Sequence, residues 1–331
     1  MSVRFCIVLG EQCKVRRMAD FFVCNDFFFT TCYNESHMIQ IYRYEVLEMF
    51  TGKTKNIGVM GDPIIHSLSP VMQNAAIAAA GVDAVYIAMP VKPENLRLAV
   101  AGLRTMGFLG WNVTIPHKSA IMPLLDSIEH DARVIGAVNT VVCDHGRLTG
   151  YNTDVNGFLD GLSSSGICPE GQHVTLLGAG GAARAVLWGV IREGASKIDI
   201  GVRNPGKAGI VADYFSDYAT IGVHEWESDE FKEILSDTDI LINTTPLGMA
   251  PNDKDMPPID WDALKQSAFV NDVIYTPSKT RFLAEAESHG HKILNGEAML
   301  VGQGAASFRL WLDVDADRNV MMNALRKALG E

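Results

Sequence analysis

A glycine-rich turn, Gly178-x-Gly180-x-x-Ala183, joins a short apolar run to a longer amphipathic one in this chain of 331 residues. Residues 173–177 have the pattern of a buried strand, and the residues after the turn have that of a helix ending near residue 193. Gly178 allows the tight turn, Gly180 lets the backbone approach a pyrophosphate, and Ala183 keeps the helix close to the strand. Free N–H groups at the start of such a helix bind phosphates. We therefore predict a dinucleotide cofactor bound by Gly178, Ala179, Gly180, Gly181 and Ala182.

The end of the next predicted strand, residues 197–202, bears on which cofactor is bound. Chains that bind NAD usually place an acidic residue there for the ribose 2′-hydroxyl. Here Arg203 and Asn204 follow the strand, whereas Asp199 lies inside it. A planar guanidinium pairs well with a 2′-phosphate. The pattern therefore favours NADP, with Arg203 and Asn204 as cofactor-binding residues, and an exposed loop arginine is the alternative interpretation.

A second α/β unit precedes the glycine turn, because apolar runs alternate with helical patterns in a way that is typical of a parallel sheet covered by helices. Ser69 and Pro70 are predicted to open the first helix, with Ser69 as its N-cap. In this unit we expect strands near residues 56–61, 84–89 and 107–113, and helices near 69–80 and 94–106. Beyond the turn we expect strands near 197–202, 239–243 and 268–274, and helices near 207–218, 229–236, 297–312 and 316–329.

Polar side chains with complementary chemistry cluster in motifs of the first unit. Together they offer hydroxyls, amides, a cation and a carboxylate, which suit a small polyhydroxylated carboxylate as ligand. Each has an ordinary structural explanation, such as a helix cap or a surface charge, but their joint occurrence before a dinucleotide fold favours a binding site. The residues are Ser67, Ser69, Asn112, Thr114, Lys118, Asn139 and Asp154.

Taken in order, these motifs resemble those of the shikimate dehydrogenase family over about residues 55–320. The resemblance implies reversible, NADP-dependent reduction of 3-dehydroshikimate to shikimate, a step of aromatic amino acid biosynthesis in the cytoplasm. The matching segments are GDPIIHSLSP at 61–70, NVTIPHK at 112–118, GAVNT at 136–140, NTD at 152–154, GAGGAAR at 178–184 and MLVGQ at 299–303.

The resemblance also implies roles for individual residues. Ser67 and Ser69 would bind the carboxylate, and Lys118 and Asp154 would be the catalytic pair. A lysine beside a carboxylate can donate or accept the proton on the reacting oxygen and stabilise developing negative charge there. Substrate hydroxyls would contact Asn112, Thr114, Asn139 and Gln303, with Tyr275 as a further substrate contact. Thr245 and Met249, in the segment 243–249, would lie beside the nicotinamide.

Two positions depart from the family pattern and keep alternatives open. Val202 stands where NADP-specific members commonly have Asn, and Asn204 where they have Thr or Ser, so one contact to the adenosine phosphate is lost. The first alternative is a quinate/shikimate dehydrogenase that uses NAD or both cofactors. The second is a non-catalytic NADP-binding regulatory module, which the presence of Lys118 and Asp154 disfavours.

Composition restricts the partners and the compartment. The net charge is −11, from 28 Lys and Arg against 39 Asp and Glu, which argues against a nucleic-acid binder. No apolar run is long enough to span a membrane. The six cysteines match no metal or disulfide motif, so we expect a reducing compartment and no metal. We interpret His289 and His291 as surface residues rather than ligands. A homodimer is a candidate oligomeric state that the sequence does not determine.

The expected class is α/β: a substrate domain with a parallel-rich sheet, a Rossmann-type cofactor domain, and C-terminal helices that return to the first domain. We expect the substrate domain at 53–157 plus 296–331 and the NADP domain at 158–295. Residues 1–52 are surplus to both, and we expect them to be disordered or an artefact. Our hypothesis is that translation begins at Met49; a genuine, poorly ordered extension is the alternative, and the intact mass of the native protein would separate the two.

Overall fold

The computed structural model describes residues 21–24, 27–33, 39–45 and 50–330, and the chain divides into two units, Met1–Thr54 and Lys55–Glu331. The first unit contains an antiparallel sheet in the order β1-β2-β3. Its strands are β1 (Phe21–Cys24), β2 (Phe27–Tyr33) and β3 (Ile39–Glu45). Met49 lies outside the described residues, so the proposed start there stays a prediction, as do the domain boundaries.

The second unit begins with a six-stranded sheet in the order β5-β4-β6-β8-β9-β7. Residues of β4 alternate between its two faces, as the pleat of a strand requires. Ile57 and Val59 pack against α1, α9 and α10, whereas Met60 packs toward α2. The strands are β4 (Lys55–Gly61), β5 (Ala84–Pro90), β6 (Gly110–Val113), β7 (Ser127–Ile128), β8 (Thr140–Asp144) and β9 (Arg147–Tyr151). The helices are α1 (Ser69–Ala80), η1 (Pro93–Asn95), α2 (Leu96–Thr105), η2 (Met122–Leu124), α3 (His130–Ile135) and α4 (Asp154–Ser164).

This sheet is mixed, because β4 pairs in parallel with β5 and β6 but β8 is antiparallel to both β6 and β9. The sequence pattern does not predict the β8–β9 hairpin. Its two-residue turn is His145-Gly146, with φ of 47° and 80°. Two central residues at positive φ are typical of hairpin turns, in which Asn-Gly is the usual pair. Histidine at the first position hides that signal.

A second six-stranded sheet, parallel throughout, has the order β12-β11-β10-β13-β14-β15. Helices cover both faces, so its central strands are fully buried runs. The strands are β10 (His173–Leu177), β11 (Lys197–Val202), β12 (Ile221–Glu225), β13 (Ile240–Asn243), β14 (Phe269–Asp272) and β15 (Lys292–Leu294). The helices are α5 (Gly181–Arg192), α6 (Pro205–Tyr214), α7 (Asp229–Asp237) and α8 (Arg281–Ser288).

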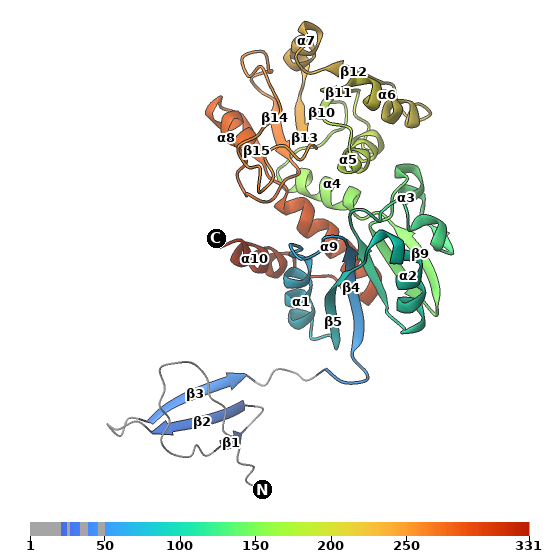
Figure 1. Ribbon diagram of the computed structural model, residues 1–331. Helices are drawn as coiled ribbons and strands as arrows, with labels where there is room; N and C mark the ends of the chain where they lie inside the picture. Colours follow the sequence, from blue (N-terminus) through green and yellow to red (C-terminus); the bar gives the residue numbers. More distant parts are fainter. Residues whose placement is uncertain (1–20, 25–26, 34–38, 46–49, 331) are drawn as a thin grey trace. The chain divides into compact units, whose positions relative to one another are not determined.

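The last helices, α9 (Glu297–Leu312) and α10 (Arg318–Leu329), return to the first sheet and lie beside α1 (Figure 1). The indole of Trp311 donates to the Val141 carbonyl at 2.9 Å, and Gln73 donates to Gly304 at 2.9 Å. The predicted α/β class, with a parallel-rich sheet, a Rossmann-type unit and returning C-terminal helices, is confirmed.

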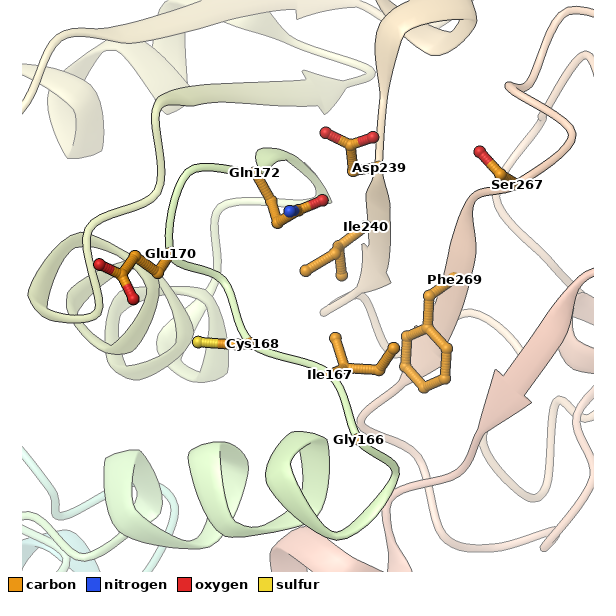
Figure 2. A pocket seen from close by; sticks show the side chains of 9 residues that line it. All are labelled: Gly166, Ile167, Cys168, Glu170, Gln172, Asp239, Ile240, Ser267 and Phe269. Atoms are coloured by element: carbon orange, nitrogen blue, oxygen red, sulfur yellow. The ribbon is translucent and has the colours of Figure 1, made fainter.

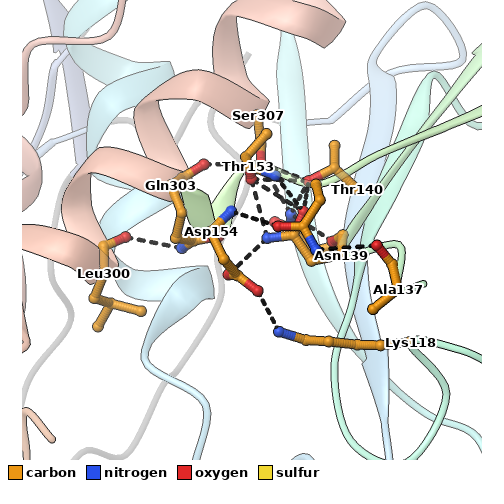
Figure 3. Close-up of polar contacts among 11 residues, drawn as sticks. Lys118, Ala137, Asn139, Thr140, Thr153, Asp154, Leu300, Gln303 and Ser307 are labelled. Carbon is orange, nitrogen blue, oxygen red and sulfur yellow. Dashed lines mark hydrogen bonds and ion pairs between the residues drawn. The ribbon is translucent and has the colours of Figure 1, made fainter. Parts of the chain in front are cut away.

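Glycines allow α9 to cross α4 at very short range. A Cβ on Gly157 would overlap the Met299 carbonyl and the Gln303 backbone nitrogen, and Gly302 lies against the Gly157 backbone. A larger residue at either glycine would push the helices apart. This crossing places Asp154, the first residue of α4, on the same side as Gln303 of α9 (Figure 3).

Two local predictions are wrong in detail. Ser69 is the first residue of α1 and not its N-cap; Leu68 takes that place without a side-chain cap, and the Ser69 N–H donates to the Ser67 hydroxyl at 3.4 Å. The helix predicted near 207–218 begins earlier, at Pro205, and ends at Tyr214. Proline is favoured in the first turn because it has no N–H to leave unpaired there.

Candidate functional site

The glycine turn has the backbone that its sequence predicts. Gly178 has φ of +95°, and a Cβ there would lie 2.7 Å from the Thr245 methyl, so glycine is required on both grounds. Gly180 and Gly181 face open space, because an added Cβ at either would meet nothing within 4 Å. Helix α5 begins at Gly181 without a side-chain cap, which leaves its first N–H groups available to a ligand. The turn can therefore accommodate a pyrophosphate.

The end of β11 lies beside this turn, since the Gly178 N–H donates to the Gly201 carbonyl at 2.9 Å. Arg203 and Asn204 follow and are exposed, as a cofactor contact requires. Val202 is buried among core residues, so its side chain is unavailable to a ligand.

The carboxylate of Asp199 is hydrogen-bonded to two histidines. Its two carboxylate oxygens each lie 2.7 Å from a histidine Nε2, those of His173 and His224. Burial alone would raise the pKa of Asp199, but the hydrogen bonds from these histidines, with Lys197 nearby, hold it below its usual value. This carboxylate is thus bound inside the sheet and is unavailable to a ribose.

The segment after β13 approaches the turn from the other side. Asn243 accepts hydrogen bonds from the Thr245 N–H at 3.0 Å and the Thr245 hydroxyl at 2.7 Å, which orders the start of the loop. The Thr245 methyl group lies 2.7 Å from where a Cβ on Gly178 would be, so the structure brings these two predicted cofactor residues together. Met249 is 48% exposed farther along the loop.

The sequence analysis did not single out Asp272 as a site residue, yet it supports this loop. Its buried carboxylate accepts from the Asn243 amide at 3.1 Å, the Ile274 N–H at 3.0 Å and the Thr280 hydroxyl at 2.7 Å. Burial raises the pKa of Asp272 from 3.8 to about 6, although these hydrogen bonds oppose the shift. Asp272 is therefore a buried, hydrogen-bonded carboxyl group that anchors Asn243 at the start of the loop.

This raised pKa makes stability depend on pH. A folded-state pKa above the unfolded value means that the folded chain binds the proton more tightly, so the free energy of unfolding falls as pH rises from 3.8 to about 6. The shift of about two units corresponds to about 3 kcal/mol. We expect the unfolding free energy of wild type minus that of Asp272→Asn to fall by about this amount between about pH 4 and pH 7. Urea titrations across that range measure it, and a difference independent of pH would contradict the assignment.

Lys118 and Asp154 meet at the centre of the candidate substrate site. Lys118 Nζ lies 2.6 Å from Asp154 Oδ2, and the Asn139 amide donates to Asp154 Oδ1 at 2.7 Å (Figure 3). The lysine and aspartate side chains are 30% and 15% exposed, so the pair is reachable but largely out of water. Asp154 opens α4, where the helix dipole stabilises a carboxylate.

A buried polar network lies behind this pair and consists of Asn112, Asn139, Thr140, Thr153 and Ser307. Asn139 accepts from the Thr153 N–H at 2.7 Å and from the Thr140 hydroxyl at 2.9 Å, which fixes the amide that holds Asp154. Ser307 of α9 lies 2.9 Å from the Thr140 hydroxyl and 3.0 Å from the Thr153 hydroxyl. The returning helix α9 is thus hydrogen-bonded to the polar residues that lie behind the Lys118–Asp154 pair.

The other predicted substrate residues lie at the start of α1, just after β6 and on α9. Ser67 and Ser69 are half-buried at the start of α1, where the Ser69 N–H donates to the Ser67 hydroxyl at 3.4 Å. Thr114 follows β6, with its N–H bonded to the Met60 carbonyl at 2.9 Å. Gln303 is half-buried on α9 and donates to the Leu300 carbonyl at 2.8 Å.

Tyr275 is less closely connected to the Lys118–Asp154 pair. It is half-buried after β14, and burial raises its pKa. None of the hydrogen bonds within residues 50–330 joins it to Lys118 or Asp154.

The sequence analysis missed Tyr86 and Ser307. The Tyr86 hydroxyl donates to the side-chain oxygen Oδ1 of Asn112 at 2.7 Å. The Ser307 hydroxyl accepts from the side-chain nitrogen Nδ2 of Asn112 at 3.0 Å. A tyrosine inside an otherwise aliphatic strand is a weak signal, because a buried hydroxyl needs a partner. Ser307 carries no local signal, since its partners are distant in the chain.

His291 also differs from expectation. It is buried, not on the surface, and its Nδ1 lies 3.1 Å from the Ala268 carbonyl; burial lowers its pKa. Among the residues that the structure describes, no group of three or more His, Cys, Asp or Glu side chains could hold a metal ion. No described helix has the length and apolar character needed to span a membrane.

A hollow of about 440 Å³ opens at the amino-terminal ends of the central strands of the second sheet (Figure 2). It lies where β13 and β14 begin, whereas the glycine turn lies where β10 ends. Ligands of doubly wound sheets bind at the carboxyl ends of the strands, so this hollow is separate from the predicted cofactor site. Its lining residues are Gly166, Ile167, Cys168, Glu170, Gln172, Asp239, Ile240, Ser267 and Phe269.

Comparison with known proteins identifies the family. The shikimate dehydrogenase substrate binding domain matches residues 59–141, and the shikimate 5'-dehydrogenase C-terminal domain matches residues 296–326. The shikimate dehydrogenase (NADP(+)) of Methanothermobacter thermautotrophicus is 43% identical over 281 residues, which cover 85% of this chain and 99% of that relative. The chain belongs to the shikimate dehydrogenase family.

Solved structures of shikimate dehydrogenases agree. A crystal structure of shikimate dehydrogenase in complex with NADP+ superposes with a TM-score of 0.79 at 38% identity and covers 86% of this chain and 98% of that one. Shikimate 5-dehydrogenase from Listeria monocytogenes, in complex with shikimate and NAD, superposes with a TM-score of 0.81 at 35% identity. The superposition covers 85% of this chain and 99% of that one. The family resemblance of the sequence motifs is therefore confirmed.

Proposed function

We propose that this chain catalyses the NADP-dependent, reversible reduction of 3-dehydroshikimate to shikimate in aromatic amino acid biosynthesis. Relatives that are shikimate dehydrogenases match nearly the whole of unit Lys55–Glu331. The observation that carries the proposal in the structure is the largely buried Lys118–Asp154 pair, 2.6 Å apart and surrounded by hydroxyl and amide groups. It provides both a proton donor and polar groups that fit a hydroxylated ring acid.

The cofactor fits the turn, because Gly180 and Gly181 leave open space before the uncapped start of α5. We propose that residues 178–182 hold the pyrophosphate, that Arg203 and Asn204 contact the adenosine phosphate, and that Thr245 and Met249 lie on the nicotinamide side. When bound, NADP supplies or accepts the hydride. The exposed guanidinium of Arg203 favours NADP over NAD.

We propose that Lys118 gives a proton to the substrate oxygen during reduction and removes it during oxidation, while its charge stabilises the alkoxide that develops. Asp154 holds Lys118 Nζ at 2.6 Å, and Asn139 holds Asp154 at 2.7 Å, so the ammonium is already oriented before the substrate arrives. In this proposal Ser67 and Ser69 bind the carboxylate, and hydroxyls are bound by Asn112, Thr114, Asn139, Tyr275 and Gln303.

Initial rates with shikimate and quinate, each with NADP and NAD, test this function. We expect turnover to be fastest with shikimate and NADP. Faster turnover with quinate or with NAD would instead support the second candidate, a quinate/shikimate dehydrogenase of broader cofactor use. The buried side chain of Val202, which cannot contact a cofactor, favours that candidate.

Arg203 gives a sharper test of cofactor choice. Because its side chain is exposed, replacing it should not disturb packing. We expect Arg203→Ala to raise the KM for NADP by about tenfold, the scale of one lost charge-assisted hydrogen bond. The KM for NAD, which lacks the 2′-phosphate, should change less than about twofold, and an equal rise for both cofactors would contradict the assignment.

We also propose the domain boundaries 53–157 plus 296–331 and 158–295, a cytoplasmic location and, as a candidate assembly, a homodimer. The location is supported by the lack of a disulfide pattern among the cysteines. The proposed boundary at 157/158 falls inside α4, which follows the first sheet and packs against both α9 and α5.

A further inference from the structure

Tyr86 contacts Asn112, a residue that the proposed function assigns to the substrate. It is 1% exposed in β5, and its hydroxyl donates to Asn112 Oδ1 at 2.7 Å. Burial raises its pKa well above the usual value, and interaction with the Ser69 side chain lowers it in part. The hydroxyl therefore keeps its proton at working pH and can act as a donor throughout.

The amide of Asn112 has a single allowed orientation. Its Nδ2 faces the Asn139 backbone carbonyl at 3.1 Å, the Thr140 hydroxyl at 3.0 Å and the Ser307 hydroxyl at 3.0 Å. A backbone carbonyl only accepts hydrogen bonds, so this side of the amide must be the NH₂ group. Rotating the amide by half a turn would set two oxygens against each other in a buried site, which is costly.

The same contacts fix what Asn112 can offer a ligand. Its two N–H bonds are directed at three protein oxygens, so neither is free for a substrate. Its carbonyl oxygen has two lone pairs, and Tyr86 occupies one of them. The remaining lone pair can only accept.

We infer that Tyr86 is a positioning residue that, opposite Ser307, fixes Asn112 as a hydrogen-bond acceptor and so makes the site select a substrate hydroxyl at that position. A keto or ether oxygen there has no hydrogen to give and would be rejected. The inference rests on the proposed function, which makes Asn112 a substrate contact. It adds that the specificity of this contact is set by a side chain with no substrate contact of its own.

A double-mutant cycle tests the inference, with shikimate as the probe and saturating NADP. Tyr86→Phe keeps the ring and removes the hydroxyl. We expect it to raise the KM for shikimate by about tenfold, the scale of one lost hydrogen bond, while kcat and the KM for NADP change less than about twofold. In an Asn112→Ala background the same change should raise the KM by less than about threefold, because its target is gone.

Each outcome decides the question. An unchanged KM in Tyr86→Phe, or an equal rise in both backgrounds, overturns the positioning role, since a purely structural tyrosine would act independently of Asn112. Ser307→Ala carries the same test if Tyr86→Phe fails to fold: it removes one of three acceptors and should raise the KM about threefold more in the wild-type background than in Asn112→Ala, where only its contacts to Thr140 and Thr153 are lost. A wild type that turns over no shikimate refutes the proposed function itself, which the wild-type measurement reveals before any variant is compared.

Discussion

Lys118→Ala is expected to lower kcat by at least about 10²-fold, the usual scale of general acid–base catalysis, while the affinity for NADP stays within about twofold. Within residues 50–330, the Lys118 ammonium is the only cation that the structure places on Asp154, and alanine leaves nothing to move the proton on the reacting oxygen. The cofactor turn lies on a different sheet, between β10 and α5, so cofactor binding should survive. Steady-state kinetics give kcat, and titration of NADPH fluorescence gives the affinity.

Lys265→Ala is the matched control for this result. Lys265 also pairs with an aspartate at 2.6 Å, Asp239, and the two side chains are 38% and 26% exposed. Asp239 lines the hollow at the amino-terminal ends of the strands of the second sheet, whereas the glycine turn lies at the carboxyl end of β10. We expect kcat to be unchanged in this variant. Near-normal turnover by Lys118→Ala, or an equal loss in both variants, would remove Lys118 from its catalytic role.

Gly180→Ala is expected to weaken NADP binding by at least about tenfold without lowering the melting temperature. Gly180 has φ of −85° and ψ of −165°, which alanine adopts freely, and its Cβ would meet no atom of the protein within 4 Å. The methyl group would instead occupy the space through which a pyrophosphate approaches the backbone. Thermal denaturation without ligand and a titration with NADPH measure the two effects separately.

Variants at two other glycines are controls for this result. Gly178→Ala should lower the melting temperature, because φ is +95° there and the new methyl would lie 2.7 Å from Thr245. Gly209→Ala, inside α6 and free of contacts, should leave NADP affinity unchanged. If Gly180→Ala binds NADPH like wild type, the pyrophosphate does not lie against this turn.

The cofactor half of the molecule was the more predictable from sequence, because its signals are local. The order of strand, glycine turn and helix at residues 173–193 is found as expected. The boundaries of α6 were harder to predict, since the apolar pattern continues past Tyr214 into a turn. Asp272 was not predicted as a site residue because Asn243, which it holds, lies 29 residues away along the chain.

The substrate half of the molecule was harder to predict, because its contacts join segments that are distant in the sequence. The motifs place Lys118, Asn139 and Asp154 in separate segments, and it takes tertiary packing to bring them within hydrogen-bond distance. Ser69 looked like a helix cap because serine favours that position, yet its backbone is already helical. Tyr86 and Ser307 matter through pairings across β5, β6 and α9, and no periodicity along the chain reports such pairings.

The central claim is that this chain reduces 3-dehydroshikimate with NADPH. It is tested most directly by incubating the full chain with both compounds and measuring NADPH consumed and shikimate formed. The account predicts one shikimate for each NADPH oxidised, together with a rate at least about 10²-fold lower in Lys118→Ala. NADPH that remains unoxidised in the presence of wild type, or that is oxidised without forming shikimate, would contradict it.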